Sequence, residues 1–220
     1  MKAACGIVVT VMLVSLGLCW ASSPAANNPI ENGSFEIVGP IGDIGAPRDW
    51  EGLAMGTIPA VVRDCEVAHD GRCSLKVISD KQVLTNAIQT VTLEPDQAYV
   101  LTGWIKTDKL EVSENADMYG TLVVVPEPVM DENLMVKGPN HNGTTDWVQV
   151  RVDFKSSPDG KMNILCSYCG QGVAKGTVWF DDLRIVPASQ APATSSAPAA
   201  SRPASRPASK PAATQPGMGH

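Results

Sequence analysis

Aromatic and basic residues are scarce in this chain of 220 residues, and each shortage excludes a class of function. Aromatic residues make up 5 % of the sequence, so any binding site built on ring stacking must be small. The net charge is −6, which argues against a nucleic-acid-binding protein, because such proteins usually carry a basic face. The apolar fraction of 44 % excludes a fully disordered chain and allows one globular domain with attached segments.

Acidic residues are absent from both ends of the chain. Residues 1–26 and 187–220 contain no Asp or Glu but hold four of the 17 basic residues. The body between them therefore has 13 basic and all 23 acidic residues, a net charge of −10. Such an acidic body suits a divalent-cation site or an extracytoplasmic protein, and does not suit a phosphate or DNA ligand.

The N-terminus has the pattern of a secretory signal peptide. A short basic start, Met1-Lys2, precedes an apolar run from Ala3 to Trp20, and small residues follow. A membrane anchor is the alternative, because about 18 apolar residues approach the length of a bilayer span. A lipoprotein processed before Cys19 is disfavoured by the bulky Leu18. We expect residues 1–26 to be removed, which leaves no membrane span and places the protein outside the cell, in the periplasm or in the cell envelope.

The C-terminus is dominated by Ala, Pro and Ser. Ser-Arg-Pro-Ala occurs at 201–204 and 205–208, and Ser-Lys-Pro-Ala follows at 209–212. Frequent proline blocks both helices and strand ladders, so residues 188–220 are expected to form a disordered, semi-extended tail. Two roles remain open for it, an inert spacer and an electrostatic tether to an anionic envelope polymer.

The body has the pattern of short strands. Between Asn28 and Val186 no window of 12 residues sustains helical periodicity, while alternation and β-branched residues recur. Strands are expected at 34–38, 57–64, 73–79, 84–94, 97–107, 118–126, 146–154, 161–168 and 176–186. Residues 27–187 are therefore predicted to be an all-β domain, a jelly-roll β-sandwich of two antiparallel sheets. Residues 127–145 are the longest irregular stretch, a loop expected to overhang one sheet.

The phase of the strands predicts which side chains face outward. Val148, Val150, Val152 and Phe154 form an inner row in 146–154, which turns Trp147, Gln149 and Arg151 away from the core. By the same reasoning Trp104 and Tyr119 lie on the outer faces of 97–107 and 118–126. Aromatic rings beside polar groups are the pattern of a sheet face that is open to a polar ligand.

One carboxylate is anomalous in the last strand. Asp181 is in phase with Trp179, Leu183 and Ile185, and burying an unpaired carboxylate costs several kcal/mol. A bound Ca²⁺ is one solution, since this ion takes carboxylate and carbonyl oxygens, and Glu36 after the Asn32-Gly33 turn offers a second carboxylate. The alternative is that Asp181 accepts backbone N–H bonds at a bend in the strand and that Glu36 is solvated.

Four segments together resemble carbohydrate-binding modules of families 4 and 9, within the galactose-binding-domain-like jelly rolls. The segments are Asn32-Gly33-Ser34-Phe35-Glu36, Tyr99-Val100-Leu101-Thr102-Gly103-Trp104-Ile105-Lys106, Thr145-Asp146-Trp147-Val148-Gln149-Val150 and Trp179-Phe180-Asp181-Asp182-Leu183. The resemblance covers about residues 28–186. It implies a structural Ca²⁺ held by Glu36, Asp181 and backbone carbonyls, with the turn at Asp70-Gly71-Arg72 nearby. It also implies that a polysaccharide lies along the concave sheet, although this chain has few aromatic residues for such a site.

Four cysteines remain after removal of the signal peptide. An even number in an exported chain favours two structural disulfides among Cys65, Cys73, Cys166 and Cys169, with three possible connectivities. Cys65 and Cys73 flank the turn at His69-Asp70-Gly71 and are placed to pair. The C-x-x-C spacing of Cys166 and Cys169 leaves a four-cysteine zinc site and redox-active thiols as alternatives.

These features favour a non-catalytic binding module for a polysaccharide or envelope glycan, expected to be a monomer. Gln149 and Arg151 would donate hydrogen bonds, while Trp104, Tyr119 and Trp147 would stack on sugar rings, and Trp50 in a preceding loop is a further candidate. None of the three His residues stands in a metal-ligand motif, and no G-x-S-x-G or P-loop pattern occurs. The alternatives are a structural or adhesive envelope protein on the same scaffold, and a glycan-active hydrolase or lyase.

Overall fold

The fold is all-β. The computed structural model describes residues 28–192 apart from 43–44, 56–59 and 129–131, so the expected signal peptide and residues 193–220 of the expected tail lie outside it. The elements in chain order are β1 (Glu51–Met55), β2 (Ala60–Asp64), β3 (Ser74–Thr92), β4 (Ala98–Val112), β5 (Asp117–Pro126), the 3-10 helix η2 (Glu132–Leu134), β6 (Val136–Lys137), β7 (Gly143–Lys155) and β8 (Lys161–Pro187). Among the described residues, no helix has the length and apolarity needed to cross a bilayer.

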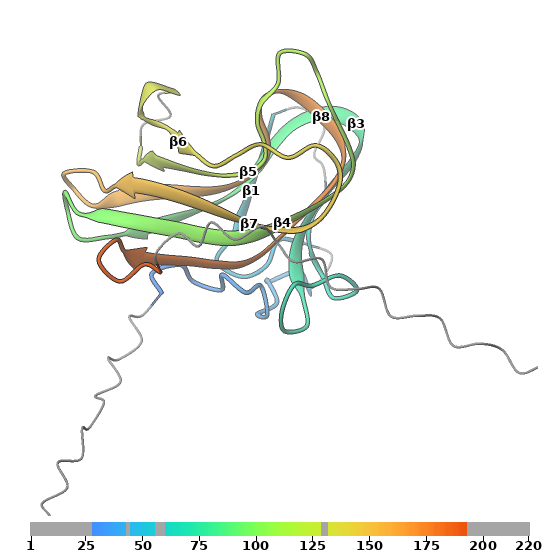
Figure 1. The fold of residues 1–220 in the computed structure, drawn as a ribbon. Helices are drawn as coiled ribbons and strands as arrows, with labels where there is room; N and C mark the ends of the chain where they lie inside the picture. Colours follow the sequence, from blue (N-terminus) through green and yellow to red (C-terminus); the bar gives the residue numbers. More distant parts are fainter. Residues whose placement is uncertain (1–27, 43–44, 56–59, 129–131, 193–220) are drawn as a thin grey trace, which may run out of the picture.

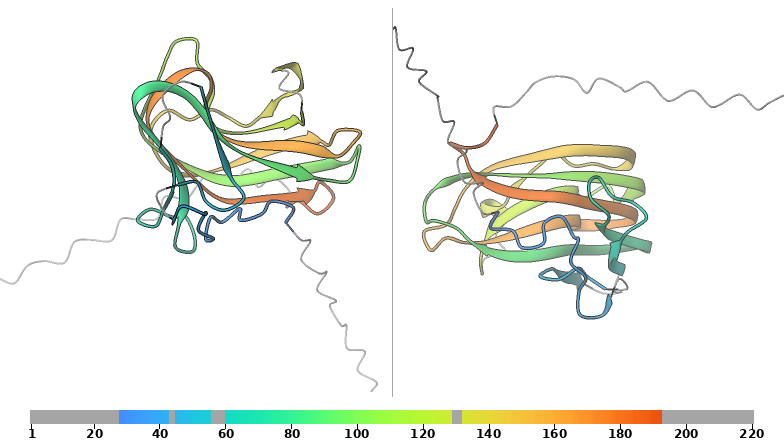
Figure 2. Two further views of the ribbon diagram at one scale, coloured as in Figure 1. Left: turned by 180° about the vertical axis from the view of Figure 1, so that it is seen from behind. Right: turned by 90° about the horizontal axis from the view of Figure 1, so that it is seen from below.

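Two long strands fold one antiparallel network into two layers. The N-terminal part of β3 pairs with the C-terminal part of β8, and the rest of β3 pairs with residues 161–169 of β8. β2, β4 and β7 complete one layer, which we call the β4 sheet, while β1, β5 and β6 complete the other, the β5 sheet. Figure 1 shows the two layers face to face, and Figure 2 shows β3 and β8 curving together from one layer into the other. The predicted jelly-roll sandwich is therefore confirmed.

The core lies between the layers and is built from the predicted inward rows. Val150, Val152 and Phe154 of β7 are buried there, as the alternation in that segment predicts. β4 contributes Leu101 and Ile105 from the opposite phase to Trp104. In β4 and β7 the period of two is therefore enough to separate these core side chains from the outer ones.

The strands expected at 73–79 and 84–94 are one strand, β3, and those at 161–168 and 176–186 are likewise one strand, β8. Register shifts between Ser79 and Asn86 bend β3 without ending it. In β8 the bend contains Gly172 and Gly176, whose φ angles are 78° and 123°. A positive φ is accessible to glycine without steric cost, so the chain turns the corner while it stays extended. Strands β1 and β6 were missed by the pattern.

The strand expected at 34–38 is wrong. Asn32 and Phe35 have φ angles of 49° and 55°, and the Phe35 N–H donates to the Asn32 carbonyl at 3.0 Å. The Asn32 side chain completes a turn by bonding the backbone of Ile37 in both directions. The turn buries the Phe35 ring completely, with its centroid 5.3 Å from that of Trp50.

Candidate functional site

The outer face of the β4 sheet brings together four of the six predicted ligand-binding residues. In the strand register Thr102 of β4 lies opposite both Arg151 of β7 and Arg184 of β8, and Trp104 lies opposite Gln149. Residues that face one another in register point to the same side of a sheet. Thr102, Trp104, Trp147, Gln149, Arg151 and Arg184 therefore share one surface, which we call the β4 face.

A histidine joins this face. The His69 ring stacks on the Trp104 ring, with centroids 3.9 Å apart and an angle of 15° between the planes. It lies nearly perpendicular to the Trp147 ring, at 72°, with centroids 5.7 Å apart. Its Nδ1 lies 2.8 Å from Asp182 Oδ2. Sequence reasoning placed His69 in a turn and missed this role, because contacts across more than 30 residues leave no trace in local spacing. The stack also covers one face of Trp104, so that this face is closed to a sugar.

The turn that carries His69 is fixed by two carboxylates. Glu36 Oε1 accepts the N–H groups of Arg72 and Cys73 at 2.6 and 3.1 Å. Asp181 Oδ2 accepts the N–H groups of His69 and Asp70 at 2.8 and 3.3 Å. The two predicted metal ligands thus reach the same turn, residues 69–73, from the two extremities of the domain.

A bulge explains why Asp181 does not face the core with Leu183 and Ile185. Thr102 and Trp104 of β4 are two residues apart, but their partners in β8, Arg184 and Asp181, are three residues apart, so β8 has one extra residue here. Asp182, within this bulge, has a φ of 52°. An extra residue in one strand shifts the phase of everything after it. Phe180 therefore faces the core before the bulge and Leu183 after it. Asp181 keeps the outer phase of Trp179, and the expectation that it shares the phase of Leu183 and Ile185 is wrong.

Asp181 is completely buried but is well supplied with hydrogen bonds. Its second oxygen, Oδ1, accepts the Asp182 N–H at 2.8 Å, which brings the number of backbone donors to three. Burial nevertheless raises the pKa of this carboxyl to about 6. Because the carboxylate has backbone donors and no ion pair among the described residues, its negative charge is compensated only by dipoles.

Carboxylate oxygens such as those of Glu36 and Asp181 are ligands that Ca²⁺ takes. The groups of the turn that point at these two carboxylates are N–H donors. Two observations argue against a cation here. The Arg63 guanidinium, itself a cation, lies 3.9 Å from Glu36 Oε2. The described residues also contain no cluster of three or more His, Cys, Asp or Glu side chains able to hold a metal. The structural Ca²⁺ therefore stays a prediction from the sequence.

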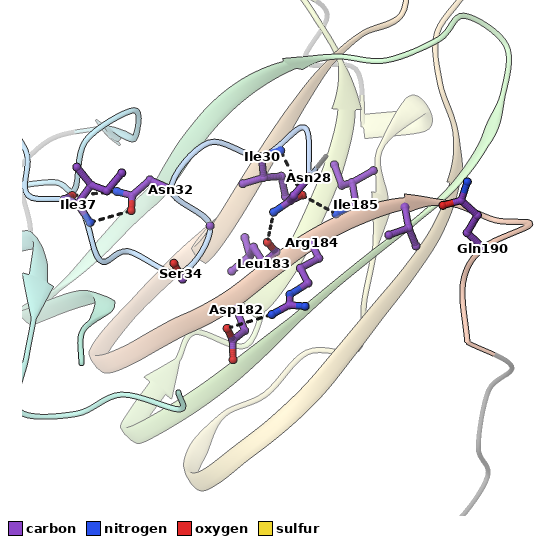
Figure 3. Close-up of a pocket in the computed structure, with 12 residues that line it drawn as sticks. Asn28, Ile30, Asn32, Ser34, Ile37, Asp182, Leu183, Arg184, Ile185 and Gln190 are labelled. Atoms are coloured by element: carbon purple, nitrogen blue, oxygen red, sulfur yellow. Dashed lines mark hydrogen bonds and ion pairs between the residues drawn. The ribbon is translucent and has the colours of Figure 1, made fainter. Parts of the chain in front are cut away.

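A cavity adjoins the β4 face. It has a volume of about 610 Å³ and lies between the N-terminal segment and the end of β8. Figure 3 shows Asp182 and Arg184 beside it, opposite Ser34. The Arg184 side chain is 67 % exposed and lies 4.0 Å from Asp182. The cavity thus extends the β4 face with polar groups over an apolar floor.

The comparisons with known proteins identify the fold. No family model and no curated protein matches the sequence. Among solved structures, TmCBM61, a family 61 carbohydrate-binding module in complex with β-1,4-galactotriose, is similar with a TM-score of 0.50 and 18 % identity, over 74 % of this chain and 99 % of that chain. A xylan-binding domain of family 22 has a TM-score of 0.51 and 15 % identity, over 76 % and 99 %. The shared feature is the fold, and families 4 and 9 stay a prediction.

Two of the predicted ligand-binding residues lie away from the β4 face. Trp50 is only 4 % exposed, because its ring packs on Phe35 and its Nε1 donates to the Asn32 carbonyl, so its predicted place at a ligand site is wrong. Tyr119 lies in β5, in the other sheet, and packs partly buried against the core. It cannot act with Trp104 and Trp147 on one ligand ring, contrary to the sequence-based grouping.

The outer face of the β5 sheet is apolar near Tyr119. Val123 and Val125 of β5 and Leu165 of β8 form a second buried cluster with Met118, and Met135 packs against it. Met135 comes from the segment 127–145, which was predicted to overhang one sheet. This face therefore offers a ligand few exposed polar groups, in contrast to the β4 face.

The cysteines confirm one predicted disulfide and exclude the other. Cys65 and Cys73 are bonded and close the loop that carries His69. Cys166 and Cys169 are free and buried, so a second disulfide and a four-cysteine zinc site are both wrong. Residues three apart in an extended strand are separated by about 10 Å, beyond the Cα distance that a disulfide spans.

We expect the two free thiols to be unreactive in the folded protein. Burial raises the pKa of Cys169 to about 11 and that of Cys166 well above its usual value, and the thiolate is the reactive form. Alkylation followed by peptide mapping should therefore modify Cys166 and Cys169 only after unfolding. Modification in the native state at the rate of an open thiol would contradict their burial.

Proposed function

We propose that the chain is a non-catalytic carbohydrate-binding module that binds a polysaccharide or envelope glycan with its β4 face. The observation that carries the proposal is the convergence of Trp147, Gln149, Arg151 and Arg184 on one outer sheet face beside a cavity. The similarity in fold to TmCBM61 and to a xylan-binding domain supports the proposal. Sugars suit such a surface, because their hydroxyls take hydrogen bonds and their C–H faces pack on aromatic rings.

The residues of the β4 face would make different contacts with a sugar. The Gln149 amide is exposed and available to sugar hydroxyls. Trp147 is partly exposed and its ring is not stacked in parallel on His69, so it is a better platform than Trp104, whose ring is stacked. Arg184 would bind sugar oxygens at the mouth of the cavity, where it extends the face toward Ser34.

A structural or adhesive envelope protein without sugar affinity is the second candidate. One observation favours it: the Arg151 guanidinium is already bound to Asp153 through Nε and Nη2 at 2.9 and 2.7 Å. With Trp104 stacked on His69, two residues of the β4 face are engaged within the protein. On this reading the aromatic cluster serves only to hold the disulfide-closed loop on the sheet.

Affinity electrophoresis of the full chain through a panel of soluble neutral glycans tests the proposal. Galactan and xylan belong in the panel, because the similar modules bind β-1,4-galactotriose and xylan. Retardation by at least one glycan, without its hydrolysis, is the expected result. Migration unchanged in every gel would favour the structural alternative, and release of reducing ends would show an enzyme.

An exported location is part of the proposal. The Cys65–Cys73 disulfide supports an oxidising compartment, since disulfides persist outside the cytosol. The signal-peptide pattern of residues 1–26 points the same way.

A structural Ca²⁺ at Glu36 and Asp181 is also proposed, and chelation tests it. A ligand that binds only the folded state at 100 times its dissociation constant stabilises that state by about 2.7 kcal/mol. The melting temperature is therefore expected to fall when a calcium chelator is added and to return with excess Ca²⁺, but not with K⁺. Equal melting temperatures with and without chelator would contradict the ion.

A further inference from the structure

The chain returns over the β4 face where it leaves the fold. After β8 ends at Pro187, the Ala188 N–H donates to Ala98 and the N–H groups of Gln190 and Ala191 donate back to Pro187 and Ala188, which forms a turn. The next residue, Pro192, accepts a hydrogen bond from Arg151 Nη1 at 3.1 Å. The last described residue is therefore already bound to the β4 face, and Gln190 lines the adjoining cavity.

The segment that follows is complementary in charge to the body of the protein. Residues 193–220 contain Arg202, Arg206 and Lys210 and no acidic side chain, whereas the body between residues 27 and 186 has a net charge of −10. At the β4 face, Asp153 beside Arg151 is 64 % exposed, and Asp146, bonded to Lys106, is 88 % exposed. Exposed ion pairs of this kind are weak, so either carboxylate can exchange its partner for a cation of the segment.

The length of the segment allows this exchange. Ten residues separate Pro192 from Arg202, which reach about 31 Å as a polyproline II chain. Arg151 and Asp146 are five residues apart on β7, about 17 Å along the strand. Arg202, Arg206 and Lys210 therefore all reach the carboxylates of this face, and a short tether gives them a high effective concentration there.

The β4 face also carries aromatic rings, on which a proline-rich segment such as residues 193–220 can dock. Proline-rich segments dock on aromatic-lined surfaces, because their chain is pre-ordered and loses little entropy on binding. His69, Trp104 and Trp147 form a cluster on this face, and Trp147 lies four residues along β7 from Arg151, which binds Pro192.

We propose that residues 193–220 dock on the β4 face of their own chain and compete there with a glycan. The contact itself does not depend on the proposed function, whereas the competition rests on it. The segment thereby acts as an internal occupant that is held by its cations on Asp146 and Asp153, and that a glycan must displace.

Zero-length carbodiimide cross-linking of the full chain tests the contact, because it joins the Lys210 amine only to a carboxylate that it touches. The monomer band is digested and mapped by mass spectrometry. Lys210 is expected to couple to Asp146 or Asp153. In the full-length variant Arg202→Glu with Arg206→Glu, this coupling should fall by about fivefold, since two surface ion pairs are lost. The matched control, Arg202→Lys with Arg206→Lys, keeps the charge and should retain the coupling.

Three results would overturn the docking: coupling only to carboxylates away from the β4 face, coupling only between chains, or equal coupling in the glutamate variant and the wild type. Glycan binding separates this inference from the proposed function. Tighter binding in the glutamate variant is expected if both hold. Loss of the cross-link in a chain that still binds glycan refutes the docking alone, and a chain that keeps the cross-link but binds no glycan refutes the proposed function alone.

Discussion

Replacing Asp181 by alanine is expected to lower the free energy of unfolding by about 3 kcal/mol. The substitution leaves the N–H groups of His69, Asp70 and Asp182 without their acceptor, and an unsatisfied buried donor costs about 1–3 kcal/mol. For a domain of this size the melting temperature should fall by about 6–12 °C. The measurement is chemical and thermal denaturation followed by circular dichroism.

Asp182→Ala is the matched control. Asp182 is the neighbour of Asp181 in β8, but among the described residues its side chain bonds only the His69 side chain and approaches Arg184 at 4.0 Å. Its removal frees no buried backbone donor, so a loss of about 1 kcal/mol is expected. Equal losses in the two variants would contradict the view that backbone hydrogen bonds to Asp181 hold the loop of residues 65–73 on the β4 sheet.

The strand pattern predicted more of the fold than of the site. Alternation assigned the inner rows correctly, because each row is a property of consecutive residues in one strand, as in Val150, Val152 and Phe154. The bulge at Asp182 was not predictable in this way, since it depends on where β8 pairs with β4. A single inserted residue moved Phe180 into the core and turned both Asp181 and Asp182 toward His69.

The predicted binding residues show the same difference between local and long-range information. Gln149 and Arg151 were assigned to the outer face correctly from the phase of their own strand. Trp50 and His69 were misjudged, because their surroundings come from distant segments: Trp50 is covered by Phe35 in an unpredicted turn, and His69 is carried onto Trp104 by a disulfide-closed loop. The pairing of Cys65 with Cys73 was predictable because it is local. The fate of Cys166 depended on the packing of the whole sandwich.

Trp147→Ala is expected to weaken glycan binding by about 30-fold, since truncating an aromatic residue at the centre of a binding surface costs about 2 kcal/mol. Trp147 is partly exposed and, unlike Trp104, its ring is not stacked in parallel on His69, so it is the ring of the β4 face that we expect to pack on a sugar. Gln149→Ala removes one neutral hydrogen-bonding side chain and should weaken binding by about fivefold. Circular dichroism melting of each variant separates a lost contact from a lost fold.

Isothermal titration of the full chain with the glycan that retards it most tests the central claim directly, because the claim is that the β4 face binds the sugar. The double variant Trp147→Ala with Gln149→Ala should lose about 100-fold in affinity or more, while Tyr119→Ala on the β5 sheet should bind like the wild type. The opposite ranking, with binding lost in Tyr119→Ala and retained in the double variant, would place the glycan on the other sheet and contradict the account.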